Sequence, residues 1–410
     1  MRTSTKKNFL KQLIPFVFTV SIPLSEAAQS HWIGSWGASP VFPVGQDMNQ
    51  NTIRQFVTLS QGGEKIQLRF SNETGTQPLM IGAVTIARPG AKPGSIDSKS
   101  LKQVLFGGQK NIIIPPGAPA LSDPIDFNVN ALDDVAISLY LPQRTGLSIV
   151  HPNGEQTAWI DSNGNTTANE ELSQTATTST MRFYLSRVEV ATDQQNGGTI
   201  VTLGDSITDG YSSGVDMNQR WPDVLAKRLK QANINNIGIV NAGISGNRIL
   251  NDLPSGQNGP SSLSRLDRDV LSVPNVRWLV IMQGINDIGH SNFDGLTKQE
   301  VSADEIINGW KQLISRAKNQ GIKTYCATLT PFKGEFLNFY SEKGEEKRQA
   351  INTWIRTSNT CDAVIDFDAV IRDDKKPQYI KAEFDVGDGL HPNANGLKAM
   401  AESIDINLFN

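Results

Sequence analysis

The sequence is poor in side chains that bind metals, because its 410 residues include only two cysteines and four histidines. No group of them has the spacing of a metal site, so we expect no metal and no other cofactor. A block of basic residues is also lacking: 38 Lys and Arg stand against 41 Asp and Glu, for a formal net charge of −3. A nearly balanced charge argues against nucleic acid as a partner.

Long apolar runs are missing as well, and no segment is long enough to span a bilayer as a helix. A short apolar stretch at residues 13–24 follows several basic residues and contains two prolines, which argue against an ordinary amphipathic helix. Ser25 and Ala27 then supply small side chains at the −3 and −1 positions of a cleavage site. We therefore expect residues 1–27 to be a signal peptide, and the mature protein, beginning near Ala28, to be secreted or periplasmic.

The two cysteines, Cys326 and Cys361, are expected to be buried and unpaired. An exported protein permits a disulfide. However, Cys326 falls within a predicted strand and Cys361 just ahead of the next one. This offset is expected to place the two Cα atoms beyond bridging distance.

The length of the chain predicts two domains, since it exceeds one ordinary core. In residues 28–192, short segments rich in β-branched and aromatic side chains alternate with Gly, Pro, Asn and Asp. This pattern predicts an antiparallel β-sandwich-like domain. Its strands are expected at residues 53–59, 65–70, 79–87, 101–106, 111–114, 135–141 and 181–190, with a surface loop at 161–179.

Residues 193–198 have the composition of a linker, and strands alternate with helices from residue 199 onward. One helix is predicted to begin at the capping box of Ser302 and Glu305 and to stop at Gly321. Five β-α units predict a parallel, doubly wound α/β sheet over residues 199–410. The strands are expected at 199–203, 237–241, 276–282, 322–329 and 363–367, and the other helices near 221–229, 343–357 and 395–408.

Four short motifs follow these strands in a fixed order. They are Gly204-Asp205-Ser206, Ser245-Gly246-Asn247, Gly284-Ile285-Asn286-Asp287 and Asp388-Gly389-Leu390-His391. In a doubly wound sheet, ligands bind outside the carboxyl ends of the strands. Each motif alone could be no more than a polar turn or a helix-entry loop. The strands are predicted from hydrophobic periodicity and not from the motifs. The motifs nevertheless all fall at the same edge of the predicted sheet, which is independent evidence for a single site.

The motifs contain the parts of a serine hydrolase. Ser206 is the candidate nucleophile, His391 the base that accepts its proton, and Asp388 the carboxylate that orients the imidazole. The backbone N–H groups of Ser206 and Gly246 and the side-chain amide of Asn286 are candidate donors to the oxyanion. Gly246 lacks a Cβ, so its backbone can approach a substrate closely.

Three further carboxylates near the motifs are expected to be structural. Asp205 and Asp209 flank the nucleophile and are expected to hold its loop through hydrogen bonds. Asp287 is expected to be a loop partner rather than a catalytic acid.

The four motifs resemble the blocks of the SGNH hydrolase superfamily, also called GDSL esterases and lipases. The lettered residues of the superfamily correspond to Ser206, Gly246, Asn286 and His391, and Asp388 corresponds to the third member of the triad. The resemblance covers roughly residues 199–410. It implies a three-layer α/β/α fold of flavodoxin-like type, no metal, and hydrolysis of carboxylic esters through an acyl-enzyme.

One residue departs from the pattern of this family. Ile207 stands where the family name has leucine, which is a mild change of an apolar residue. The Gly-x-Ser-x-Gly elbow is absent, which disfavours a common α/β-hydrolase. The opening residues 31–36 and the β-rich region resemble exported members with an added β domain.

The sequence thus predicts an exported serine esterase, a carboxylic ester hydrolase acting on short acyl groups, with acetyl groups on polysaccharide as the leading expectation. The same residues could serve an envelope glycan O-acyltransferase, or a lipase or lysophospholipase acting on longer chains. The β domain could also bind carbohydrate through Trp32, Trp36 and Trp159, although aromatics in such domains more often belong to the core.

Overall fold

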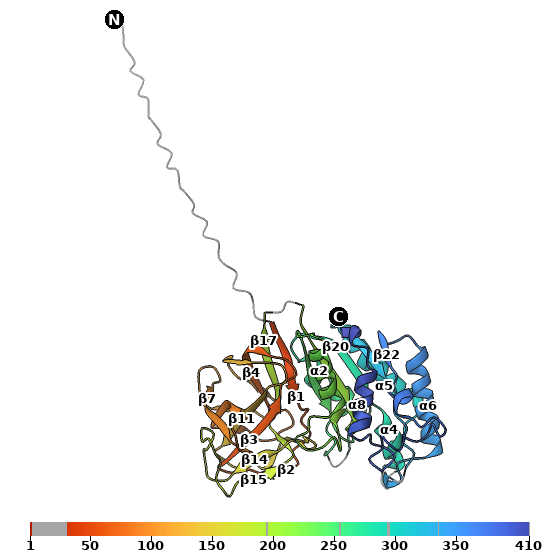
Figure 1. Cartoon of the computed structure of the whole chain (residues 1–410), viewed down its shortest axis with the longest axis horizontal. Helices are drawn as coiled ribbons and strands as arrows, with labels where there is room; N and C mark the ends of the chain where they lie inside the picture. Colours follow the sequence, from red (N-terminus) through yellow and green to blue (C-terminus); the bar gives the residue numbers. More distant parts are fainter. Residues whose placement is uncertain (2–30, 194–195, 254–255, 293–295, 335, 410) are drawn as a thin grey trace.

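The computed structural model describes residues 1, 31–193, 196–253, 256–292, 296–334 and 336–409. Apart from Met1, the predicted signal peptide lies outside these residues. A β-rich part, coloured red to yellow-green, lies beside an α/β part coloured green to blue (Figure 1). None of the helices in the described ranges is both long and apolar enough to cross a membrane.

The β-rich part consists of two antiparallel sheets and three short strand pairs. The first sheet contains β1 (His31–Gly37), β17 (Leu185–Thr192), β4 (Gly63–Ser71) and β10 (Ile125–Val129) in that order, with β9 (Pro119–Leu121) beside β4. The second contains β15 (Thr177–Ser179), β14 (Ala158–Asp161), β3 (Asn51–Thr58), β11 (Asp134–Leu141), β6 (Ala83–Pro89) and β7 (Ile96–Val104). The short pairs are β2 (Gly45–Asp47) with β12 (Leu147–Ser148), β5 (Leu79–Ile81) with β8 (Ile112–Ile114), and β13 (Val150–His151) with β16 (Arg182–Phe183).

The two large sheets share one hydrophobic core, as in a β-sandwich. Ile66 of β4 and Val188 of β17 belong to the same buried cluster as Ile53 of β3 and Ile137 of β11. The expected antiparallel β-sandwich architecture is therefore confirmed.

Several strand limits differ from the sequence prediction. The segment at residues 79–87 is two strands, separated at Gly82, and the segment at 181–190 is divided at Tyr184, whose φ is +58°. The predicted loop at 161–179 ends in β15. The sequence prediction missed β1, because its two glycines weaken the strand signal and its stability comes from pairing with β17.

The α/β part is a five-stranded parallel sheet with helices on both faces. Its order is β19 (Ile237–Gly243), β18 (Gly198–Gly204), β20 (Val276–Met282), β21 (Lys323–Ala327) and β22 (Ala363–Ile365). The helices are α1 (Ser206–Asp209), α2 (Trp221–Gln231), α3 (Ser262–Leu266), α4 (Ile285–Gly289), α5 (Ala303–Lys318), α6 (Glu342–Thr357), α7 (Phe367–Ile371) and α8 (Ala394–Ser403). Among the described residues there are also five shorter helical turns: η1 (Asp267–Leu271), η2 (His290–Asn292), η3 (Thr297–Gln299), η4 (Phe336–Asn338) and η5 (Ile406–Phe409).

Alternate residues of β18 point to opposite layers. Ile200 of β18 packs in a cluster with Trp221 of α2 and Leu397 of α8. Val201 packs in another cluster with Trp310 of α5 and Leu266 of α3. The three-layer α/β/α fold is therefore confirmed.

The helices begin and end largely where the sequence indicates. The capping box at the start of α5 is present, and Gly321 takes φ of +74° just after that helix. The last helix, α8, ends at Ser403, earlier than predicted, and a 3₁₀ turn follows.

The prediction for the cysteines was wrong. Cys326 and Cys361 form a disulfide, with their Cα atoms 5.9 Å apart. Cys326 is fully buried in β21, whereas Cys361 is half-buried. The chain bends at Cys361 just before β22, so this residue does not follow the straight strand that the offset argument assumed.

The two parts of the chain are joined directly. β1 packs against β19, and the N–H of Gly34 in β1 donates to Oγ1 of Thr199 in the neighbouring strand β18 at 2.9 Å. Gly238 of β19 permits this approach, because a Cβ there would overlap the carbonyl oxygen of Gly34. The β-rich part is thus packed on the edge of the parallel sheet.

Candidate functional site

Three of the four motifs lie at the ends of neighbouring strands. Ser206 begins α1 directly after β18, Gly246 follows β19, and Asn286 lies in α4 after β20. β18 lies between β19 and β20 in the sheet, so these residues lie at one edge with Ser206 in the middle. The strand order therefore explains why the motifs converge.

Ser206, His391 and Asp388 form a continuous chain of hydrogen bonds. Ser206 Oγ lies 2.9 Å from His391 Nε2, and His391 Nδ1 lies 2.6 Å from Asp388 Oδ2. An ionised carboxylate can only accept, so Nδ1 carries a hydrogen in this arrangement. When the imidazole is neutral, Nε2 is then free to accept the hydroxyl hydrogen of Ser206.

Local hydrogen bonds hold Asp388 in place. Its Oδ1 accepts the N–H groups of Leu390 and His391, each at 2.8 Å. Partial burial favours the neutral acid, but the hydrogen bonds from His391 outweigh it and lower the pKa of Asp388. The carboxylate therefore stays charged beside the imidazole.

The Asn286 side chain is oriented by the turn that contains Gly246. Its Nδ2 donates to the carbonyl oxygen of Asn247 at 3.1 Å, and Gln283 Nε2 donates to the same oxygen at 2.8 Å. A primary amide has two N–H groups, so one remains for another acceptor. Gly246 itself has φ of +73°, a left-handed conformation that favours glycine.

The three neighbouring carboxylates have the structural contacts expected of them. Asp205 Oδ1 accepts the N–H of Ile207, and Asp209 Oδ2 accepts the N–H and the hydroxyl of Ser245. Asp287 accepts the N–H groups of Ile249 and Leu250, at 2.8 and 3.0 Å. Together these contacts tie the motif loops to one another.

Burial raises the pKa of two of these carboxyl groups. The pKa of Asp205 rises to about 7 and that of Asp287 to about 6. The side chains of both residues are almost inaccessible to solvent, which penalises the charged forms.

The sequence analysis did not identify the aromatic residues beside His391. The Tyr211 ring centroid lies 4.5 Å from that of the imidazole, and the Phe336 ring lies 5.4 Å from it. Ser206 and His391 are only 6% and 5% exposed, whereas Tyr211 is 40% exposed. No periodicity in the sequence pairs either aromatic residue with His391.

A second missed residue, His151, comes from the β-rich part. Its Nε2 lies 2.8 Å from Asp209 Oδ1, although the two residues are 58 positions apart. A single histidine in a β-strand has no sequence signal that could assign this contact.

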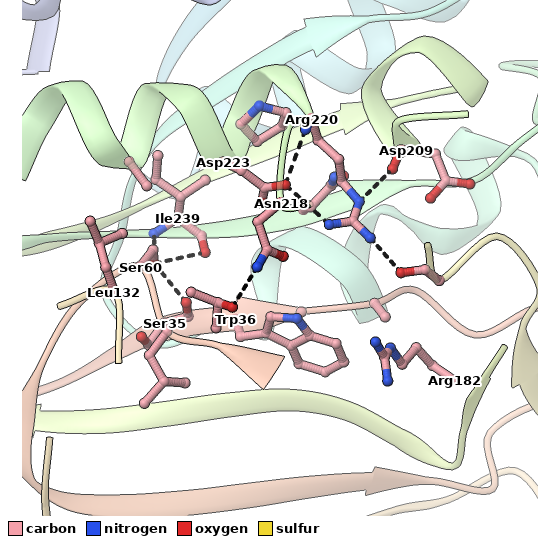
Figure 2. A pocket seen from close by; sticks show the side chains of 18 of the residues that line it. Ser35, Trp36, Ser60, Leu132, Arg182, Asp209, Asn218, Arg220, Asp223 and Ile239 are labelled. Atoms are coloured by element: carbon pink, nitrogen blue, oxygen red, sulfur yellow. Dashed lines mark hydrogen bonds and ion pairs between the residues drawn. The ribbon is translucent and has the colours of Figure 1, made fainter. Parts of the chain in front are cut away.

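The tryptophans proposed to bind sugar lie in different settings. Trp36 lines a cavity between the two parts of the chain, and the lining of that cavity also includes Arg220 (Figure 2). Trp159 packs over Gly94, at which a Cβ would meet the indole ring. The lining of the cavity in Figure 2 includes neither Ser206 nor His391.

A family model described as GDSL-like Lipase/Acylhydrolase matches residues 200–404. A search of curated protein sequences finds no match. Similar solved structures include a putative lipolytic protein of the G-D-S-L family from Desulfitobacterium hafniense DCB-2, with 22% identity, a TM-score of 0.37, and coverage of 50% of this chain and 97% of that one.

The acetyl xylan esterase AlAXEase is similar over 50% of this chain and 96% of its own, with 22% identity and a TM-score of 0.38. The aryl esterase of M. smegmatis has 17% identity and a TM-score of 0.40 over 50% of this chain and 96% of its own.

Proposed function

Because the chain belongs to the GDSL-like lipase/acylhydrolase family, we propose that it is an exported serine esterase that hydrolyses short-chain carboxylic esters through an acyl-enzyme on Ser206. The unbroken hydrogen-bond chain from Ser206 Oγ through His391 to Asp388 is the observation that carries this proposal. It supplies a nucleophile, a base and an orienting carboxylate in the geometry that acyl transfer requires.

In the first half of the reaction, Ser206 Oγ attacks the ester carbonyl while His391 Nε2 takes the hydroxyl proton. The carbonyl oxygen becomes an oxyanion, for which Asn286 Nδ2 and the N–H groups of Ser206 and Gly246 are the proposed donors. The imidazolium then gives its proton to the departing alcohol oxygen as the C–O bond breaks. Asp388 stabilises the imidazolium and keeps Nδ1 protonated throughout.

In the second half, water attacks the acyl-enzyme. His391 Nε2 accepts a proton from the water, and the same donors stabilise the second oxyanion. Collapse breaks the bond to Ser206 Oγ, which regains its proton from His391. The products are the free acid and the original enzyme.

For the substrate, we propose acetyl or other short acyl groups borne on a sugar. The alcohol must leave next to His391, since that residue protonates it, and the half-exposed Tyr211 ring lies there. A ring of this kind can stack on the apolar face of a pyranose. This position supports a carbohydrate as the leaving group.

Replacement of Ser206 by alanine tests the proposed reaction. We expect Ser206→Ala to abolish p-nitrophenyl acetate hydrolysis, and Ser315→Ala, at an exposed position on α5, to leave it unchanged. Retention of full activity in Ser206→Ala would remove the proposal. A chain-length series of nitrophenyl esters beside acetylated xylan tests the substrate, and a preference for long acyl chains would contradict the short-acyl assignment.

Export is part of the same proposal. Disulfides persist mainly in oxidising compartments, so the Cys326–Cys361 bond supports a location outside the cytoplasm. N-terminal sequencing of the protein secreted from an expression host checks this. Cleavage near Ala28 is expected, and recovery of the intact N-terminus only from the cytoplasm would contradict export.

A further inference from the structure

The turn before the candidate oxyanion donor is held by a carboxylate that is itself bound from the β-rich part. Asp209 Oδ2 accepts both the N–H and the hydroxyl of Ser245, at 2.8 and 2.7 Å. Ser245 immediately precedes Gly246, whose N–H is the proposed donor. The orientation of Asp209 therefore sets where the Ser245–Gly246 peptide lies.

The other oxygen of Asp209 contacts His151, which lies on β13. His151 Nε2 is 2.8 Å from Asp209 Oδ1, and His151 Nδ1 is 2.9 Å from the carbonyl oxygen of Ser39. Both partners are acceptors, so both ring nitrogens are best satisfied when each carries a hydrogen. Burial alone disfavours the charged ring, but Asp209 and Ser39 outweigh it and raise the pKa of His151.

Backbone interactions hold both His151 and Asp209 in place. β13 pairs with β16, so that His151 lies opposite Arg182, and the N–H of Val41 donates to Val150 at 2.9 Å. On the catalytic side, Arg220 Nε donates to the carbonyl oxygen of Asp209 at 3.0 Å. His151 and Asp209 are 6% and 3% exposed, so water offers no substitute for their bond.

We propose that His151 is a positioning residue, through which the β-rich part orients Asp209 and thereby the Ser245–Gly246 turn for oxyanion stabilisation. This inference rests on the proposed esterase function. It makes the β-rich part a component of the active site rather than only a module that binds carbohydrate. Misplacing a reacting group by about 1 Å can lower a rate about 100-fold, so the loss of such support is measurable in kcat.

The cavity in Figure 2 provides a specific test. It has a volume of about 60 Å³, and its lining includes His151, Asp209 and Arg220. Removal of the His151 side chain opens its site to this cavity, so free imidazole can enter and bind Asp209. Rescue by imidazole distinguishes a positioning role from a general loss of packing.

The variants are His151→Ala and His151→Gln, with Gln61→Ala as the matched control. Gln61 Nε2 also bonds across the two parts, to the carbonyl oxygen of Asn235, but it does not contact Asp209 or Ser245. Acetate release from triacetin is the assay, because imidazole by itself hydrolyses activated nitrophenyl esters. We expect kcat to fall about 10- to 100-fold in His151→Ala with KM changed less than threefold, and Gln61→Ala to match the wild type.

Imidazole is expected to raise kcat of His151→Ala at least fivefold and to leave the wild type unchanged. The glutamine variant keeps a neutral donor, so it should remain folded and lose kcat to a smaller extent. A folded His151→Ala enzyme with wild-type kcat would overturn the inference, and so would a folded His151→Gln enzyme that loses as much kcat as His151→Ala. So would a loss of kcat in His151→Ala that imidazole does not restore.

A fluorophosphonate probe separates this inference from the proposed function. If the wild type is phosphonylated on Ser206 but releases no acetate, the proposed esterase function fails, and the labelling rates of the same variants still test His151. Slower labelling in His151→Ala, restored by imidazole, is the expected result. No labelling of the wild type would overturn both.

Discussion

Replacing Gly246 with alanine should damage both stability and catalysis, for two reasons visible in the structure. Gly246 has φ of +73°, which a residue with a Cβ rarely adopts. A Cβ at this position would also overlap Asn258 Nδ2, with Asn258 Cγ 2.7 Å away. That amide donates to the carbonyl oxygen of Ser245 at 2.6 Å, so the clash displaces a bond within the turn itself.

The loss of folding stability in Gly246→Ala follows from these two effects. A left-handed conformation costs a non-glycine residue about 1–2 kcal/mol. Loss of the Asn258 hydrogen bond adds about 1 kcal/mol. The expected loss of stability is therefore about 2–3 kcal/mol. If the turn shifts enough to misdirect the Gly246 N–H, kcat should also fall about 10²- to 10³-fold.

Gly321 provides a matched control within the α/β part. It has φ of +74°, almost the same as Gly246, but a Cβ there would meet nothing within 4 Å. Gly321→Ala should thus carry the conformational cost alone, about 1–2 kcal/mol, with kcat unchanged. Alanine also lowers the conformational entropy of the unfolded chain, which favours folding by a similar amount in both variants and cancels in the comparison.

Urea denaturation and steady-state kinetics on the two variants check the prediction. Gly246→Ala should unfold at a lower urea concentration than Gly321→Ala and should be the only one to lose kcat. Adding Asn258→Ala to Gly246→Ala should not restore the lost hydrogen bond but should relieve the overlap and recover part of kcat. Equal stability and equal kcat in the two single variants would refute the reasoning about the turn.

Three further predictions concern other parts of the fold. Asp388→Asn should lower kcat about 10⁴-fold, because the amide can stabilise the wrong tautomer of His391; activity within tenfold of the wild type in a folded variant would contradict the proposed triad. Replacing Cys326 and Cys361 by serine opens a loop with a sequence separation of 35 and should cost about 4 kcal/mol in urea denaturation, with an unchanged midpoint as the contrary result. Burial raises the pKa of Asp205 in the folded protein to about 7, from the ordinary value of 3.8. As pH rises, Asp205 therefore ionises first in the unfolded chain, and the stability that this group contributes to the folded protein is lost between about pH 4 and pH 7. Asp205→Asn should therefore gain more stability relative to the wild type at pH 8 than at pH 5, and an equal difference at both pH values would argue against a neutral Asp205.

The contact between Ser206 and His391 could be predicted although the residues are 185 positions apart. Ser206 follows the first predicted strand of the parallel sheet, and His391 lies in the loop before the last predicted helix. A parallel sheet gathers such segments at one edge. Hydrophobic periodicity and capping residues are local properties, so they identified the five parallel strands and the start of α5. For the same reason, the supporting roles of Asp205, Asp209 and Asp287 could be foreseen from their places in the motifs.

Contacts that depend on how elements pack could not be predicted in this way. The disulfide depends on a bend at Cys361, which changes the distance that strand offset alone indicates. Likewise, Tyr211 and Phe336 come to lie beside His391 only because separate loops meet over it.

By itself, the sequence determined the parallel α/β sheet, the β-sandwich and the residues that converge at the strand ends, because local periodicity and motif order specify them. Only the tertiary structure decided that the β-rich part reaches the site. The bond from His151 to Asp209 exists because β1 packs on the edge of the parallel sheet, which places β13 beside the end of α1. That docking depends on the shapes of two folded surfaces, and no local pattern along the chain encodes it.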